Sequence, residues 1–135
     1  LDKFNNTITE KLKNSKLVPN VDIFIKYLYD KNYVLYISSK SNEQDIVSTL
    51  KHKHLLQYFK GIYGLPYSKN IHFQLIREIE NIEGKNICFF GDSMGDYITS
   101  VDENTEFIGI LTDKTDLQNV FCKKINDYNQ IQILF

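Results

Sequence analysis

Short apolar runs alternate along this chain with segments whose apolar residues recur every three or four positions. The clearest runs are residues 33–37, 86–90 and 107–111. Runs of this length, rich in β-branched and aromatic side chains, are typical of buried parallel strands. Because helical segments lie between them, the alternation predicts a three-layer α/β fold, Rossmann-like, with a mostly parallel central sheet.

Apolar positions at helical spacing locate the helices. One helix follows Pro19, and its apolar stripe is formed by Val21, Phe24, Ile25 and Leu28. Ser41, with Gln44 three residues later, has the capping-box pattern of a second helix. A third helix is predicted within residues 68–83. A fourth is expected to bury Ile98 and Val101.

The length of 135 residues suits one ordinary domain, so we expect a single core domain over residues 1–135. Within it, residues 1–18 are expected to contain a short helix whose apolar positions are Phe4, Ile8 and Leu12. Residues 19–135 would then carry the rest of the core and the candidate functional residues.

Composition excludes several classes of protein. The net charge of −1 gives no broad basic surface for nucleic acid, and no apolar run is long enough to cross a membrane. The N-terminal residues lack the apolar segment of a signal peptide. Cys88 and Cys122 lie in apolar runs and are interpreted as buried free thiols, which favours a cytoplasmic setting.

Two carboxylates follow the predicted strand 86–90, in the sequence Gly91-Asp92-Ser93-Met94-Gly95-Asp96. The carboxyl ends of parallel strands are where open α/β sheets bind ligands. Magnesium prefers one or two carboxylates together with water and phosphate oxygens, so Asp92 and Asp96 are candidate metal ligands. An ordinary turn is an equal alternative for this motif alone, because Asp and Ser also cap helices.

Two further features are candidates for phosphate binding. Ser38 and Ser39 directly follow the predicted strand 33–37 and precede a helix. Hydroxyl and backbone N–H groups at such a place can hold a phosphate, although serines there are more often simple helix caps. Lys69 stands at the start of the helix predicted within residues 68–83 and could neutralise phosphate, although a lone lysine is usually a surface group. His52, His54 and His72 have no partner at metal-ligand spacing and are interpreted as structural.

Taken in order, these features resemble three motifs of the haloacid dehalogenase (HAD) superfamily of hydrolases. Residues 36–41 look like its hydroxyl-bearing strand end, Ser68-Lys69 like its lysine motif, and residues 91–96 like the acidic motif of its phosphatases. The resemblance covers roughly residues 17–135. It implies a HAD-like core and a magnesium-dependent phosphatase acting on a phosphorylated substrate.

The resemblance also implies a role for each residue. Ser38 would hydrogen-bond the phosphoryl group with help from the backbone N–H of Ser39, and Lys69 would neutralise charge between that group and the nucleophile. Asp92 would bind Mg²⁺ directly, and Asp96 would bind it directly or through a water.

The family's first motif, Asp-x-Asp at the end of the first central strand, has no match in this chain. Residues 2–7 are Asp-Lys-Phe-Asn-Asn-Thr, with no apolar strand before them. We therefore expect the first central strand to be missing, and the nucleophilic Asp to lie upstream of residue 1. The intervals before Pro19 and between Ser38 and Lys69 leave no room for a large cap, and the resulting open site suits a bulky substrate or closure by a second subunit in a homo-oligomer.

Two alternatives belong to other classes. One is a catalytically silent HAD-fold module that binds or regulates. The other is a receiver-like or flavodoxin-like α/β domain, which offers no role for Lys69 in this order.

Overall fold

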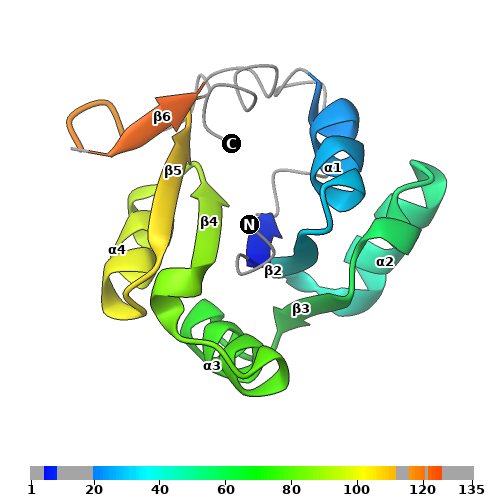
Figure 1. The fold of residues 1–135 in the computed structure, drawn as a ribbon, viewed down its shortest axis with the longest axis horizontal. Coiled ribbons are helices and arrows are strands. Elements are labelled where there is room, and N and C mark those ends of the chain that lie inside the picture. Colours follow the sequence, from blue (N-terminus) through cyan, green and yellow to red (C-terminus); the bar gives the residue numbers. More distant parts are fainter. Residues whose placement is uncertain (1–4, 9–19, 112–115, 121, 126–135) are drawn as a thin grey trace.

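The described residues of the computed structural model (5–8, 20–111, 116–120 and 122–125) form a six-stranded sheet with the order β3-β2-β1-β4-β5-β6. Every neighbouring pair of strands is parallel. The strands are β1 (Asn5–Ile8), β2 (Val34–Asn42), β3 (Gly61–Leu65), β4 (Ile87–Gly91), β5 (Glu106–Ile110) and β6 (Lys123–Ile125). Figure 1 shows the sheet surrounded by helices, which confirms the predicted α/β fold.

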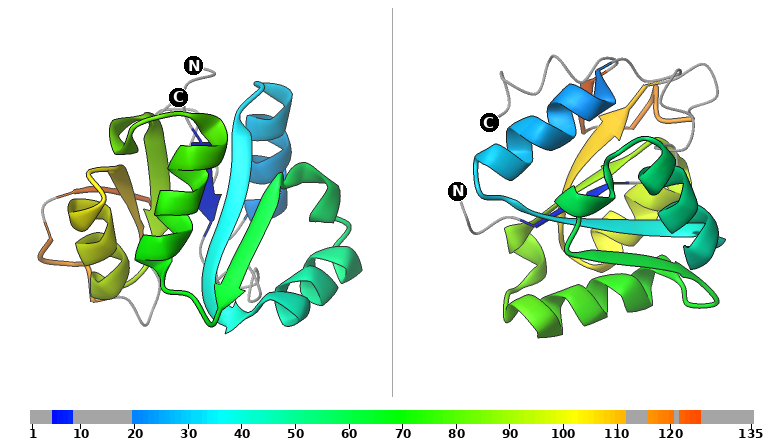
Figure 2. Two further views of the ribbon diagram at one scale, coloured as in Figure 1. Left: turned by 90° about the horizontal axis from the view of Figure 1, so that it is seen from below. Right: turned by 90° about the vertical axis from the view of Figure 1, so that its right-hand side faces the viewer.

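Four α-helices of the described residues cover the two faces of this sheet. They are α1 (Val21–Asp30), α2 (Glu43–His52), α3 (Lys69–Glu80) and α4 (Met94–Asp102). Two short 3₁₀ turns, Leu56–Tyr58 and Gly84–Asn86, precede β3 and β4. The views of Figure 2 show α1 and α3 on opposite sides of the strands, as the three-layer prediction requires.

Each face of the sheet has its own apolar core. On the α1 and α2 side, Phe24 packs edge-on against Phe90 with ring centroids 5.0 Å apart. On the α3 side, Phe73 packs in the same manner against Phe89 at 4.9 Å. Phe89 and Phe90 are both fully buried and point to opposite faces, so β4 is covered on both sides. A strand buried in this way explains the continuous apolar run that the sequence shows there.

The N-terminal segment departs from its prediction. Residues Asn5–Ile8 form β1 in the place expected to be empty, between β2 and β4, instead of a turn of helix. The helix prediction is therefore wrong for these four residues, and Phe4 and Leu12 lie outside the described residues. The physical reason is tertiary. β2 and β4 each present backbone N–H and C=O groups along one edge, and a strand between them forms hydrogen bonds with both edges.

Two helices also differ in detail. The N-cap of α2 is Asn42 and not Ser41, and the Asn42 side chain accepts a hydrogen bond of 2.8 Å from the N–H of Gln44. In α4, the expected core residues Ile98 and Val101 are 52% and 60% exposed. The side of α4 that is buried carries Asp96, Thr99 and Ser100 instead.

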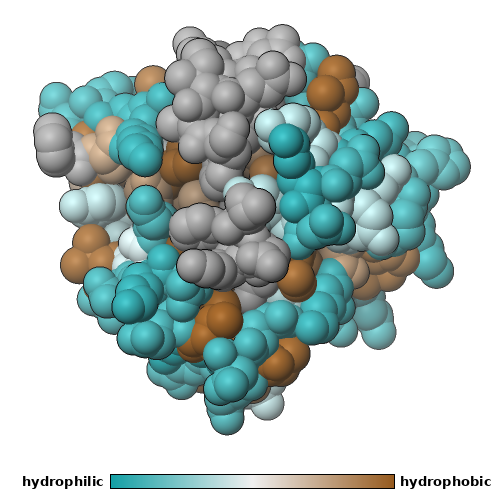
Figure 3. Space-filling view, in the orientation of Figure 1, coloured by the Kyte–Doolittle hydropathy of each residue, from teal (hydrophilic) through white to brown (hydrophobic). Residues whose placement is uncertain are grey.

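Hydrophobic residues on the face shown in Figure 3 are interspersed with hydrophilic ones. None of the helices in the described part of the chain has the length and apolar character that a membrane crossing requires. Both cysteines are free, as predicted; Cys88 is buried and Cys122 is partly exposed. Burial raises the pKa of the Cys88 thiol far above its ordinary value, which makes it unreactive.

Candidate active site

The strand order places the candidate residues at one edge of the sheet. The order of the strands reverses between β1 and β4: β2 and β3 follow β1 on one side, and β5 and β6 follow β4 on the other. Open α/β sheets bind ligands outside the strand ends at such a point. Ile8 of β1 pairs with Ile37 on one side and with Phe90 on the other. Ser38 is the next residue after Ile37, and Asp92 is the second after Phe90, so β1 brings two distant motifs to the same edge.

Lys69 and Asp96 form a buried ion pair at this edge. Lys69 Nζ donates to Asp96 Oδ1 at 2.6 Å, and the two side chains are 8% and 3% exposed. Lys69 is the first residue of α3, after the N-cap Ser68, and Asp96 lies in the first turn of α4. The pair therefore joins the lysine motif to the acidic motif, and the surface position considered for Lys69 is wrong.

Three further features of residues 91–96, here called the acidic loop, fix the position of the Asp96 side chain. Ser93 caps α4 and its hydroxyl accepts from the backbone N–H of Asp96 at 3.1 Å. The other carboxylate oxygen of Asp96, Oδ2, accepts from the N–H of Asp92 at 3.2 Å. A Cβ on Gly91 would lie 2.5 Å from the Cβ of Asp96, so this glycine is needed for the close approach. Gly95 has no such neighbour, because its nearest contact would be Ser93 Oγ at 3.7 Å.

The donor set at this point fits a magnesium ion. Asp92 and Asp96 are buried, at 6% and 3% exposure, and both supply the hard carboxylate oxygens that Mg²⁺ prefers. Both oxygens of Asp96 already accept a hydrogen bond, one from Lys69 and one from the Asp92 backbone. Because both of its oxygens are engaged, Asp96 would hold such an ion through a water.

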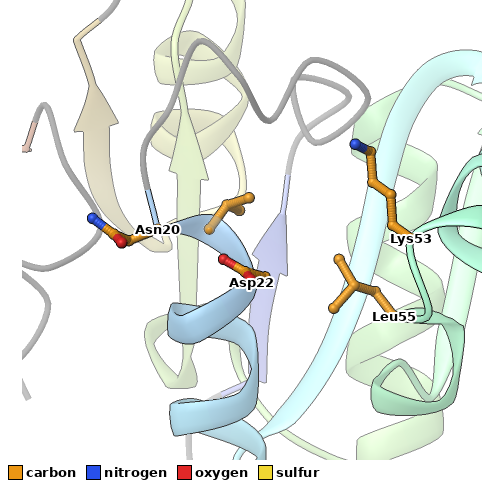
Figure 4. A pocket seen from close by; sticks show the side chains of 5 residues that line it. Asn20, Asp22, Lys53 and Leu55 are labelled. Carbon is orange, nitrogen blue, oxygen red and sulfur yellow. The ribbon is translucent and has the colours of Figure 1, made fainter.

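A cavity of about 360 Å³ opens beside the ion pair. Its polar wall includes Ser39, Lys69, Asp96 and Thr99, and exposed residues 65–67 form an apolar rim. A second cavity of about 300 Å³ lies between the start of α1 and the segment after α2. Figure 4 shows Asn20 and Asp22 on one side of it and Lys53 and Leu55 on the other. It contains none of the predicted site residues.

Ser38 has an unexpected partner. Its hydroxyl lies 2.7 Å from Nδ1 of His72, and both side chains are essentially inaccessible. The other ring nitrogen of His72, Nε2, lies 2.9 Å from the carbonyl oxygen of Gly64. Sequence reasoning treated His72 as structural, although its position three residues after Lys69 puts both on one face of α3 and was a usable signal.

Comparisons with known proteins give a matching family model and several solved structures with a similar fold. Residues 1–110 match the family model described as haloacid dehalogenase-like hydrolase. No curated protein matches the chain. Among solved structures, a predicted phosphoglycolate phosphatase from Haemophilus somnus is similar with a TM-score of 0.79 at 19% identity, over 87% of this chain and 56% of that one.

Two other solved structures give the same fold. A predicted phosphatase from Clostridium acetobutylicum has a TM-score of 0.74 at 21% identity, over 85% of this chain and 58% of its own. The core domain of a candidate phosphoglycolate phosphatase from Streptococcus pneumoniae has a TM-score of 0.79 at 13% identity, over 100% of this chain and 96% of its own. The chain thus spans little more than half of the first two structures and almost all of the isolated core domain.

Proposed function

This chain belongs to the haloacid dehalogenase-like hydrolase family, and we propose that it is the core of a magnesium-dependent phosphatase. The observation that carries the proposal is the buried ion pair of Lys69 and Asp96 on the wall of an open cavity, with the buried Asp92 four residues before Asp96. Phosphoryl transfer depends on fixed positive charge around the phosphoryl oxygens more than on covalent chemistry. A buried ammonium beside two carboxylates provides that charge together with a place for a metal.

The proposed division of labour follows from the contacts. Magnesium held by Asp92, and through water by Asp96, would supply a second positive charge to the phosphoryl oxygens. Lys69 approaches the cavity with its ammonium fixed by Asp96, so it can orient a phosphoryl oxygen without losing much rotamer entropy. Ser39 contributes to the cavity wall, and Ser38 precedes it in the same strand, at the point where the regular pairing of β2 with β3 ends.

The nucleophile is the remaining part of the proposal. Asn5–Ile8 contains no carboxylate, so the aspartate that would form an aspartyl-phosphate would have to be supplied by another segment, for which we propose the sequence upstream of residue 1. A parent protein with this aspartate would hydrolyse a phosphorylated substrate at an open site, in the reducing cytoplasm that the free cysteines favour. An open site is also compatible with closure by a second subunit.

One observation favours a second function. β1 already occupies the sheet position at whose end the family's nucleophile stands, and its four residues are Asn, Asn, Thr and Ile. A chain with this strand and no other source of a carboxylate would bind phosphate and magnesium without turnover. This is the catalytically silent binding or regulatory module.

The first test is magnesium binding by the 135-residue chain. Thermal unfolding is followed as MgCl₂ is added, with Asp92→Asn as the altered site and Asp102→Asn, at the far end of α4, as the matched control. A ligand that binds the native state raises the melting temperature by mass action. We expect the increase in the wild type and the Asp102→Asn variant and not in Asp92→Asn; equal behaviour of all three would refute the metal site.

The second test separates the two functions. Hydrolysis of p-nitrophenyl phosphate is measured for this chain and for the chain extended by its natural upstream sequence. Turnover that appears with the extension and requires an aspartate within it supports the phosphatase. Magnesium binding without turnover in both forms supports the silent module.

A further inference from the structure

His72 connects the phosphate side of the site to the backbone of β3. It lies on α3 and is 1% exposed, with Nδ1 at 2.7 Å from Ser38 Oγ and Nε2 at 2.9 Å from the Gly64 carbonyl oxygen. Its ring also stacks on Tyr63, with centroids 5.7 Å apart. These contacts fix the plane and the position of the ring, so the imidazole cannot exchange its two partners by a small rotation.

The protonation pattern follows from the partners. A carbonyl oxygen can only accept a hydrogen bond, so Nε2 carries a proton in every state of the ring. In the neutral ring Nδ1 is then bare and accepts, which requires the Ser38 hydroxyl to donate its single proton to His72. A phosphoryl oxygen also only accepts, so Ser38 in this state has no proton to offer it.

A protonated ring reverses the direction of this hydrogen bond. Nδ1–H then donates to Ser38 Oγ, and the hydroxyl proton of Ser38 is released to point at an acceptor. We propose that His72 is a positioning residue that sets the direction of the Ser38 hydroxyl, and that binding of a phosphoryl group takes up one proton on His72. This inference rests on the proposed function, because it concerns the same phosphate site.

Charges around the ring agree with a neutral resting state. Burial lowers the pKa of His72 from its ordinary value, and the nearby Lys69 ammonium on the same helix lowers it further. The backbone groups of Gly64 and Tyr67 and the carboxylate of Glu43, at the start of α2, act in the opposite direction. Burial raises the pKa of Tyr63, the group that faces the ring from β3, so this phenol is neutral. A dianionic ligand next to Ser38 adds negative charge, which favours the protonated ring.

The test uses sulfate, whose charge does not change near neutral pH and therefore does not confuse the titration. The wild-type chain, in buffer containing magnesium chloride, is titrated by NMR with and without saturating sulfate. The ring nitrogens of His72 report the tautomer and the pKa, and the backbone amides of Ser39 and Lys69 report sulfate binding. The neutral ring should carry its proton on Nε2, and sulfate should raise the His72 pKa.

The pH dependence of sulfate affinity measures the same coupling between proton uptake on His72 and ligand binding. With one proton taken up, apparent sulfate affinity should fall roughly three- to tenfold per pH unit as the pH rises above the His72 pKa. His72→Asn keeps an amide near Nδ1 that can accept or donate without titrating, so this dependence should vanish while binding remains. Ser38→Ala should weaken binding and also lose the dependence.

The outcomes separate this inference from the proposed function. Sulfate that shifts the Ser39 and Lys69 amides without changing the His72 pKa would overturn the inference and leave the phosphate site intact. A neutral ring protonated on Nδ1 would overturn it as well. No shift of those amides at any pH would overturn the phosphate site and the inference together.

Discussion

Gly91 and Gly95 differ in the space that surrounds them: a side chain at Gly91 would clash with Asp96, whereas Gly95 has room for one. At Gly91 an added methyl group would meet Asp96 Cβ at 2.5 Å and Oδ2 at 2.8 Å. At Gly95, which is exposed in α4, the nearest atom would be Ser93 Oγ at 3.7 Å. We expect Gly91→Ala to lower the free energy of unfolding by about 1–3 kcal/mol, as overpacking does. Gly95→Ala should raise it by up to about 1 kcal/mol, because alanine favours helix.

Urea unfolding of the two variants measures this difference. Magnesium adds a second readout, since displacement of Asp96 in Gly91→Ala should also reduce the stabilisation by MgCl₂. Equal stability of the two alanine variants would contradict the geometry of the acidic loop. Both glycines could be proposed from sequence as backbone requirements, but only the packing of Asp96 against Gly91 distinguishes them.

The Lys69–Asp96 pair makes a second prediction at the scale of single residues. Replacing Lys69 by Met leaves the buried Asp96 carboxylate without its 2.6 Å partner. Breaking a buried pair in this way costs about 3–5 kcal/mol of unfolding free energy. Lys85→Met is the matched control, because Lys85 and Glu83 are exposed and 3.8 Å apart, and it should change stability by less than about 0.5 kcal/mol. Chemical denaturation checks both, and similar losses would contradict the pair's burial.

At the scale of elements, Glu80 at the end of α3 connects this helix to β2 and to Lys60, the residue before β3. Its Oε2 accepts from Tyr36 Oη and from Lys60 Nζ, each at 2.5 Å. Burial by itself raises the pKa of Glu80, but the hydrogen bonds from Lys60 and Tyr36 outweigh it and hold the pKa below its ordinary value. A carboxyl with a lowered native pKa stabilises the fold above its unfolded pKa and loses that contribution as the pH falls through the native value.

This sign gives a pH prediction. Wild-type stability should fall on acidification below about pH 4.5 by a contribution that Glu80→Gln lacks, so the two stabilities should converge in acid. Glu78→Gln, at an exposed position of the same helix, is the control and should keep the wild-type profile. The measurement is urea unfolding across the acid range. A constant difference between wild type and Glu80→Gln at all pH values would show that the ion pair does not carry the effect.

Elements also show what the sequence can and cannot predict. The strand end that precedes Asp92 was predictable, because apolar runs mark the strands and parallel strands bring their carboxyl ends together. The end of β2 was not, since the strand continues past Ser38 through polar residues to Asn42. The buried face of α4 was not predictable from the sequence. Asp96 forms an ion pair with Lys69 of another helix and is buried, and Ile98 is therefore exposed. The contact of His72 with Ser38 was not predictable for the same reason: the two residues are 34 positions apart, and only the packing of α3 on β2 joins them.

For the whole molecule, β1 is the least predictable and most central element. Four polar and β-branched residues gave no strand signal, yet they pair with β2 and β4 at every position from Asn5 to Ile8. A deletion of residues 1–8 would leave both neighbours with unpaired backbone groups. We expect this shortened chain to lose cooperative thermal unfolding, whereas deletion of residues 1–4 alone should retain it. A native-like amide spectrum after removal of 1–8 would contradict the central place of β1.

The position of β1 also has a consequence for the order of folding. Asn5 pairs with Ile87, and these residues are 87 − 5 = 82 positions apart. Pairings so distant in sequence slow the search for the native topology, because loop closure must precede the contact. During synthesis the first strand leaves the ribosome long before β4, and the two halves of the sheet cannot join until β4 follows. The acidic loop, which comes directly after β4, therefore reaches its native surroundings late.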